Sequence, residues 1–333
     1  MVSAVIFVAT SCVSPLTGFA FWETNLAYEG ESIYNYLQVK NLSDRTILST
    51  NVLFGVQSVT MKDKGLTGMY YDTALAAPAL ASHADSALIL GMGTGTYARQ
   101  LRQYYPDMRV TGVEIDQKIT DLAGRYFDEP SDIEVSTYDG RAWLAASENT
   151  YDVIMVDAYQ DITIPFQMSS AEFFDLVRSH LNPGGVMVVN MNMISDGRRS
   201  INEALTDTIS SVFGSDAVRT ADVPGTTNRE LFARNAGGSG DKAGLSDPAA
   251  LESAAYDRTH SHELASTMAD VAGRMQAVDD PAERADATIL TDDKAPVEVL
   301  GMRAIDNIIA EEAGPYRELL KTEGIAGLLK AVQ

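Results

Sequence analysis

The stretch Ser86-Ala-Leu-Ile-Leu-Gly-Met-Gly-Thr-Gly95 decides the fold, because an apolar run passes directly into a glycine-rich turn. The run 86–90 predicts a buried strand. Gly91, Gly93 and Gly95 allow the backbone to turn sharply and a ligand to approach it closely. Helical spacing follows and ends at Pro106. The stretch therefore predicts a strand, a tight turn and a helix, with a ligand held at the turn.

The same alternation of strand and helix continues along the chain. We predict strands over 109–115, 133–137, 151–156 and 186–190, and helices over 96–105, 118–127 and 171–181. Strands that alternate with helices predict a parallel sheet covered on both faces, which is a Rossmann-like α/β fold. Such sheets bind their ligands outside the carboxyl ends of the strands.

Three carboxylates stand at successive strand ends of this sheet. Glu114 ends the second strand, about 20 residues after the glycine turn, where a carboxylate can accept hydrogen bonds from ribose hydroxyls. Asp139 and Asp157 end the third and fourth strands. Thr96 stands where pyrophosphate binders have their third glycine, which favours a nucleoside without phosphates over NAD. The pattern predicts a shared site for an adenosyl ligand such as S-adenosylmethionine.

The remaining segments suggest four further regions. Residues 1–22 carry no charged side chain and predict a membrane-anchor stub, with a buried or disordered leader or an export signal as alternatives. Residues 30–70 predict a small antiparallel β domain, which precedes the Rossmann-like domain at 71–235. Residues 236–248 are rich in glycine and predict a flexible loop, and 249–333 a helical and closing segment, with one helix over 249–275.

Composition limits the function classes. The chain has 25 Lys and Arg against 46 Asp and Glu, a net charge of −21, which disfavours nucleic acid as a partner and favours cationic ligands. One Cys excludes an internal disulfide, and one Cys with four His leaves little for a structural zinc site. We therefore expect no metal, and a cytoplasmic catalytic domain that residues 1–22 could anchor to a membrane.

The chain resembles the spermidine synthase (polyamine aminopropyltransferase) family from about residue 32 to residue 300. The motifs that carry the resemblance are Leu88-Ile-Leu-Gly-Met-Gly-Thr-Gly95, Gly112-Val-Glu-Ile-Asp116, Tyr138-Asp-Gly140, Tyr151-Asp-Val-Ile-Met-Val-Asp157, Leu181-Asn-Pro-Gly-Gly185 and Leu290-Thr-Asp-Asp-Lys-Ala-Pro-Val-Glu298. The first five also suit many methyltransferases, whereas the N-terminal β domain and the closing motif are more specific. The chain looks most like the bacterial branch in which the catalytic domain follows membrane helices.

The resemblance implies a role for each site residue. Glu114 would bind the ribose, and Asp139, with Gly140 beside it, would lie next to the adenine. Gln57 would face the sulfonium side chain of the donor. Asp157 would be the catalytic acid that receives the acceptor amine. The co-substrate implied is decarboxylated S-adenosylmethionine, with the intact form as the alternative.

Two departures from the family concern the amine ligands. Thr94 stands where the family has an Asp that grips the aminopropyl ammonium, and Gln160 stands where it has a second acid, with Asp161 next to it. Tyr70, Tyr159, Gln160 and Asp161 are therefore candidate residues for binding the acceptor rather than assigned ones.

Three functions remain open from the sequence. The first is aminopropyl transfer from decarboxylated S-adenosylmethionine to a diamine such as putrescine. The second is methyl transfer from intact S-adenosylmethionine, and the third is a polyamine- or nucleoside-binding module that has lost its chemistry. Thr94 favours the second and third, whereas the β domain and the closing motif favour the first. A homodimer is a further expectation.

Overall fold

The structure is a computed structural model that describes residues 23–51, 56–63, 65–128, 130, 132–159, 164–192, 200–235 and 246–304. The predicted leader 1–22, Gln160, Asp161 and most of the predicted loop 236–248 lie outside these residues. No helix among the described residues is long and apolar enough to cross a bilayer.

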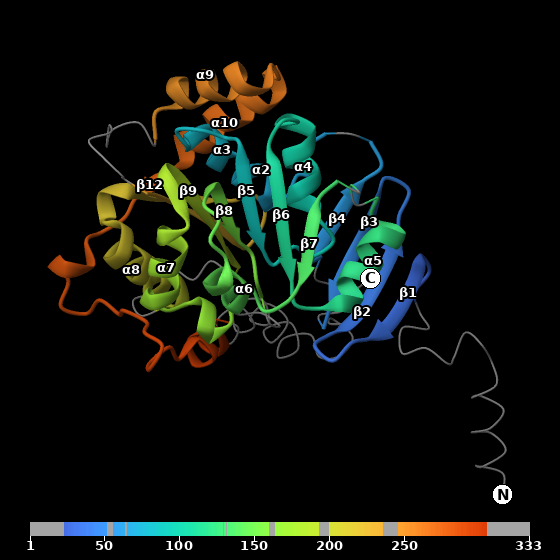
Figure 1. Cartoon of the computed structure of the whole chain (residues 1–333), viewed down its shortest axis with the longest axis horizontal. Coiled ribbons are helices and arrows are strands. Elements are labelled where there is room, and N and C mark those ends of the chain that lie inside the picture. Colours follow the sequence, from blue (N-terminus) through green and yellow to red (C-terminus); the bar gives the residue numbers. More distant parts are fainter. Residues whose placement is uncertain are drawn as a thin grey trace, which may run out of the picture.

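The N-terminal part forms a four-stranded antiparallel sheet in sequence order. Its strands are β1 (Leu26–Glu31), β2 (Tyr36–Asn41), β3 (Arg45–Thr50) and β4 (Ser58–Met61). Leu37, Val39 and Leu48 are fully buried and pack against Ile119 and Phe127 of the second domain. A shared apolar cluster therefore holds this sheet beside the Rossmann-like region, as Figure 1 shows on the right of the molecule.

The main sheet has eight strands in the order β12-β10-β11-β9-β8-β5-β6-β7. They are β5 (Ser86–Leu90), β6 (Arg109–Glu114), β7 (Glu134–Thr137), β8 (Tyr151–Val156), β9 (Leu181–Asn192), β10 (Val218–Asp222), β11 (Asn228–Arg234) and β12 (Gln276–Ala277). β5 to β9 are parallel, whereas β10 to β12 pair antiparallel. The chain moves outward from β5 to β7 and returns to β8, so the switch in strand order lies between β5 and β8.

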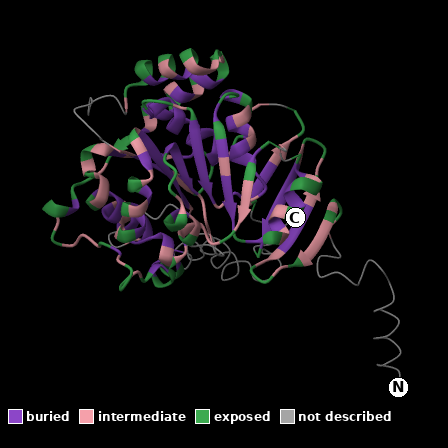
Figure 2. Cartoon of the chain, in the orientation of Figure 1, coloured by how far each residue is buried: buried purple, intermediate pink, exposed green. Residues whose placement is uncertain are grey.

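Helices cover both faces of the main sheet (Figure 1). One face carries α2 (Tyr70–Ala74), α3 (Ala76–Leu80), α4 (Thr96–Tyr104), α9 (Pro248–Thr259) and α10 (His262–Arg274), and the other carries α6 (Gly140–Ala146), α7 (Ala171–Ser179) and α8 (Ile201–Phe213). α5 (Gln117–Tyr126) packs against the N-terminal sheet. The central strands are buried on both sides (Figure 2). The predicted Rossmann-like fold with an antiparallel N-terminal sheet is confirmed.

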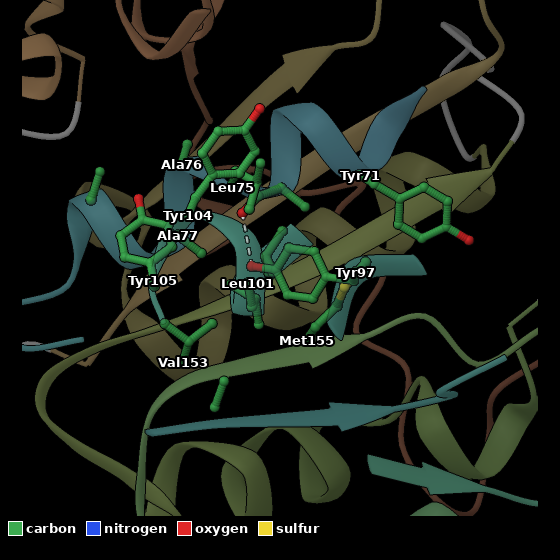
Figure 3. Close-up of a cluster of buried hydrophobic side chains, with 14 of the residues drawn as sticks. Tyr71, Leu75, Ala76, Ala77, Tyr97, Leu101, Tyr104, Tyr105, Val153 and Met155 are labelled. Carbon is green, nitrogen blue, oxygen red and sulfur yellow. Dashed lines mark hydrogen bonds between the residues drawn. The ribbon is translucent and has the colours of Figure 1, made fainter. Parts of the chain in front are cut away.

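Tyrosines fill much of the core between the sheet and α4 (Figure 3). Tyr97 is almost fully buried, and its hydroxyl donates a hydrogen bond to the Ala74 carbonyl at 3.1 Å. Because a buried hydroxyl without a partner is costly, this bond fixes α4 relative to α2. α2 begins at a residue that lines the cavity described below, and α4 follows the glycine turn that lines it. Packing in this core therefore fixes the position of the cavity walls.

Two local predictions differ from the structure. The single helix expected over 249–275 is divided into α9 and α10, because His260 adopts a left-handed conformation (φ 54°) and Ser261 caps the next helix. The helix predicted over 171–181 ends at Ser179, and the strand predicted over 186–190 begins earlier, at Leu181, so that Asn182-Pro-Gly-Gly185 lies within β9. Both differences lie away from the carboxyl ends of β5 to β8.

Candidate active site

A cavity of about 270 Å³ lies at the carboxyl ends of β5, β6 and β8, where the N-terminal sheet adjoins them. Its walls are formed by Tyr34, Asn35, Leu48, Thr50, Gln57, Ser58, Tyr70, Tyr71, Gly91, Met92, Gly93, Val113, Glu114, Ile115, Ile119, Tyr138, Asp139, Gly140, Asp157, Ala158, Tyr159, Pro165, Gln167 and Met168. The cavity includes the strand switch point, which is where open α/β sheets bind ligands.

The glycine turn after β5 forms one wall. Gly91 has φ +90°, and a Cβ there would lie 2.4 Å from the Asp157 carbonyl oxygen. A side chain at this position would push apart the ends of β5 and β8. Gly93 has φ +55°, and its N–H points toward Glu114. Gly95, the third predicted glycine, caps α4 and is not among the residues that line the cavity.

Glu114 is buried at the end of β6, and both its oxygens are already engaged. Oε2 accepts a hydrogen bond from the Gly93 N–H at 2.8 Å, and Oε1 accepts one from the Asp116 N–H at 3.0 Å. Burial raises the pKa of Glu114, while these backbone donors lower it. Each carboxylate oxygen can accept more than one hydrogen bond. Glu114 can therefore bind a ligand hydroxyl while it also holds the glycine turn.

Asp139 lies after β7 and caps α6. Its Oδ1 accepts a hydrogen bond from the Ala142 N–H at 2.8 Å. Gly140 begins the helix behind it, and both residues line the cavity. The cap uses one of the two carboxylate oxygens, so the cap and a ligand contact are compatible.

Asp157 follows β8, and two side chains of the described residues donate hydrogen bonds to it. The Tyr70 hydroxyl donates to Oδ2 at 2.6 Å, and the Asn190 amide donates to Oδ1 at 2.8 Å. Burial raises the pKa of Asp157 to about 7, against these two hydrogen bonds, which lower it. A carboxyl that titrates near neutrality can take up and release a proton at physiological pH, which is the property a general base needs.

On the side of the cavity next to the N-terminal sheet, two hydrogen bonds are accepted by a backbone carbonyl and a serine hydroxyl rather than by an acid. The Gln57 carbonyl accepts a hydrogen bond from the Tyr71 hydroxyl at 2.8 Å. Gln57 lines the cavity, as the resemblance implies. Ser58 Oγ accepts a hydrogen bond from the Thr94 N–H at 3.2 Å, which joins the two domains at the glycine turn.

The loop between β1 and β2 closes over the same wall. Ser32 and Asn35 both donate to Asp116 Oδ2, at 2.5 and 3.0 Å. These bonds bring Tyr34 to the cavity, although it lies about 80 residues from Asp116 in sequence. The sequence carries no local signal for this contact.

The structure therefore brings together Gln57, Tyr70, Gly91, Gly93, Glu114, Asp139, Gly140, Asp157 and Tyr159 of the predicted site residues. The Tyr159 hydroxyl is used in the scaffold, since it donates to the Asn190 carbonyl and accepts from the Asn192 N–H. Its ring still lines the cavity. Three exposed cavity residues were not predicted: Tyr34, Ile115 and Tyr138. Ile115 and Tyr138 are each adjacent in sequence to a predicted acid. That adjacency to a strand-end acid is a signal that could have identified them.

Comparison with known proteins agrees with this geometry. Residues 69–230 match the spermine/spermidine synthase domain. A probable polyamine aminopropyl transferase of Bifidobacterium longum is 76% identical over the whole chain, which spans 75% of that protein. A polyamine aminopropyltransferase of Vibrio vulnificus is 28% identical over 53% of the chain and 62% of that protein.

Solved structures share the fold. A probable spermidine synthase from Corynebacterium glutamicum superposes with a TM-score of 0.58 at 22% identity, over 69% of this chain and 87% of that one. A spermidine synthase in complex with the transition-state analogue AdoDATO gives a TM-score of 0.53 at 19% identity, over 66% of this chain and 75% of that one. With the domain match and the 76% identical relative, the chain belongs to the polyamine aminopropyltransferase (spermidine synthase) family.

Proposed function

We propose that the protein transfers an aminopropyl group from decarboxylated S-adenosylmethionine to a diamine such as putrescine. The observation that carries the proposal is Asp157, a carboxyl with a pKa raised to about 7 by burial, which lines the same cavity as the ribose-binding candidate Glu114. The 76% identical relative named a probable polyamine aminopropyl transferase supports the same reaction.

In the proposed reaction the acceptor nitrogen forms a bond to the donor carbon attached to sulfur. The carbon–sulfur bond breaks, and its electrons neutralise the sulfonium to give methylthioadenosine. The acceptor must lose a proton before it attacks, which costs about 4.6 kcal/mol for an alkylamine at pH 7. Asp157 takes that proton, and the Tyr70 hydroxyl holds the carboxylate in place. The sulfonium is already a good leaving group, so the step requires no metal.

In the same proposal the donor occupies the other end of the cavity. Glu114 accepts hydrogen bonds from the ribose, and Asp139 and Gly140 lie beside the adenine. Gln57 faces the sulfonium side chain. Tyr138 and Ile115 offer exposed ring and aliphatic surface beside these acids, which suits a flat base.

One observation keeps methyl transfer as a second candidate. Thr94 is fully buried, and its hydroxyl has no hydrogen-bond partner in the part of the chain that the structure describes. An acid at this position would attract the aminopropyl ammonium of a decarboxylated donor and repel the carboxylate of the intact one. Threonine does neither, so the choice of donor has to be measured.

The test is a comparison of the two donors. We expect calorimetry on the full chain to give at least about tenfold tighter binding of decarboxylated than of intact S-adenosylmethionine. Putrescine should then yield methylthioadenosine and spermidine, detected by mass spectrometry. Tighter binding of the intact donor together with methylated products would overturn the proposal in favour of the methyltransferase.

Anchorage and assembly are separate proposals. The uncharged segment 1–22 attaches a cytoplasmic catalytic domain to the membrane, and the chain forms a homodimer. An anchored chain should pellet with membranes and be released by detergent but not by high salt. Light scattering on the detergent-purified protein measures the oligomeric state. Release by salt contradicts the anchor, and a monomer mass contradicts the dimer.

A further inference from the structure

Glu230 is a buried acid for which the reaction described above has no use. It lies in β11 with 0% exposure, and neither carboxyl oxygen has a hydrogen-bond partner among the described residues. Leaving a buried polar group unpaired costs about 1–3 kcal/mol, and more for a charge. A buried acid that is retained at this cost indicates a function, and the residues around Glu230 indicate which function.

Glu230 belongs to a row of polar side chains that crosses three strands and ends at Asp157. In the register of β11 and β9, Glu230 lies opposite Asn190, so both side chains point to the same face. Asn190 in turn donates to Asp157 at 2.8 Å. Strands lie about 4.8 Å apart, which places the backbones of Asp157 and Glu230 about 10 Å apart. The face they share is the one covered by α2 and α4.

Among the described residues, the charge that acts on Glu230 is negative. Burial raises the pKa of Glu230 well above its usual value, and the negative charge of Asp157 raises it further. The other titratable neighbours are Tyr97 from α4 and Tyr159 after β8, and the charge of Glu230 raises the pKa of each. The carboxyl groups of Asp157 and Glu230 therefore form two sites that suit cations. Glu230 has no hydrogen bond from a Lys or Arg side chain among the described residues.

We propose that Glu230 binds the second ammonium group of a diamine acceptor whose first nitrogen reacts at Asp157. The inference rests on the proposed function, because it assigns the far end of the acceptor in that reaction. Two hydrogen bonds of about 2.8 Å plus a four-carbon chain match a separation of this size. Glu230 then serves as the second acid that the chain lacks at Gln160.

For the ammonium to reach Glu230, the Asn190 side chain has to turn aside from the row. Asn190 is held by two side-chain bonds, one to Asp157 and one from the Asn228 amide to its Oδ1 at 2.9 Å. The acceptor's first nitrogen replaces the bond to Asp157. Asn190 therefore separates the two acids when the acceptor is absent.

The test compares putrescine with butylamine, which has the same carbon chain and one nitrogen. In Glu230→Gln we expect the dissociation constant of putrescine, measured by calorimetry, to rise at least about tenfold. Butylamine affinity and donor affinity should change less than about twofold. The ratio of kcat/KM for putrescine over butylamine should fall by the same factor of about ten or more. Glu252→Gln, on the exposed side of α9, is the matched control and should change none of these values.

Glu230→Asp keeps the test informative if the glutamine variant folds poorly. It withdraws the carboxyl by one methylene, so preference should shift from putrescine toward the five-carbon diamine. An unchanged ratio of putrescine to butylamine, or an unchanged chain-length preference in Glu230→Asp, overturns the inference and makes Glu230 a neutral core residue. Because calorimetry with putrescine needs no turnover, a wild-type protein that binds putrescine through Glu230 without transferring a group would refute only the proposed function.

Discussion

The two ends of the cavity hold their carboxylates by different means. At the donor end, Glu114 and Asp139 accept hydrogen bonds from backbone N–H groups of the glycine turn and of α6. At the acceptor end, the hydrogen bonds to Asp157 among the described residues come from the Tyr70 and Asn190 side chains. Glu230, which is buried beside Asn190 and outside the cavity wall, has no hydrogen-bond partner among those residues. Backbone donors are fixed by the fold, whereas side-chain donors can move.

This difference suits the two ligands in the proposed reaction. A ribose and an adenine are neutral and need fixed acceptors in a constant geometry. An amine arrives with a proton that it must lose, so the acid that meets it has to change its charge. Asp157 can do this because burial raises its pKa to about 7. The predictions below test whether the contrast is functional.

The largest effect is expected at Asp157. Asp157→Asn keeps the size of the side chain but cannot take a proton, so we expect turnover to fall at least about 100-fold. Donor affinity, set at the other end of the cavity, should change less than about fivefold. Steady-state kinetics and donor calorimetry on the same preparation measure both. Full activity in this variant would show that the acid is structural.

The same variant should be more stable than the wild type at neutral pH. The pKa of Asp157 is higher in the folded chain than its ordinary value of 3.8, so ionisation opposes folding increasingly from about pH 4 to pH 7. At pH 8 we expect Asp157→Asn to raise the unfolding free energy by about 2–4 kcal/mol. Near pH 4 the gain should vanish, as denaturant titrations at both pH values can check. Equal stability at pH 8 would contradict the raised pKa.

The second effect concerns Glu114. Glu114→Gln removes the charge but leaves one carbonyl oxygen, so the two backbone N–H groups cannot both keep an acceptor. We expect donor affinity to fall about tenfold by calorimetry, since charge-assisted bonds are worth about 1.5–3 kcal/mol. Glu134→Gln, on the exposed side of β7, is the control. Unchanged donor binding in a folded Glu114→Gln would remove Glu114 from the site.

A smaller effect is expected in the pH profile of Tyr70→Phe. The Tyr70 hydroxyl bond lowers the pKa of Asp157, so its loss should raise that pKa above about 7. The rising limb of kcat/KM against pH should then move to higher pH by about one unit. Tyr126→Phe, whose hydroxyl bonds the Ala27 carbonyl, is the control. A limb that stays in place would mean that another group titrates.

The residues at the donor end could be predicted from sequence because each of them lies at or just after the end of a strand. Gly91, Gly93, Glu114 and Asp139 follow strands directly, and a strand end in a parallel sheet fixes where the next residue lies. At the acceptor end, Asp157 could be predicted for the same reason, whereas Tyr70 and Tyr159 were candidates without a defined role. Tyr70 reaches Asp157 from 87 positions away, through the packing of α2 on the sheet.

Glu230 shows where such reasoning fails. Its place depends on β11 entering the sheet antiparallel between β9 and β10, and no pattern in residues 218–234 specifies that order. A one-residue change in register would turn the side chain to the other face. The pairing with Asn190, and therefore the row to Asp157, exists only in three dimensions.

The smallest effect tests whether Asp139 serves the ligand as well as its helix. Asp139→Asn can still cap α6 through its carbonyl oxygen, but it then presents an amide NH₂ to the cavity, where the adenine amino group needs an acceptor. We expect unchanged thermal stability and donor affinity about fivefold weaker by calorimetry, because one hydrogen bond is worth about 1 kcal/mol. Asp139→Ala should lose that affinity and also about 1 kcal/mol of stability, since it removes the cap. If Asp139→Asn binds the donor as the wild type does, the carboxylate acts only on α6, and the donor end rests on Glu114 and the glycine turn alone.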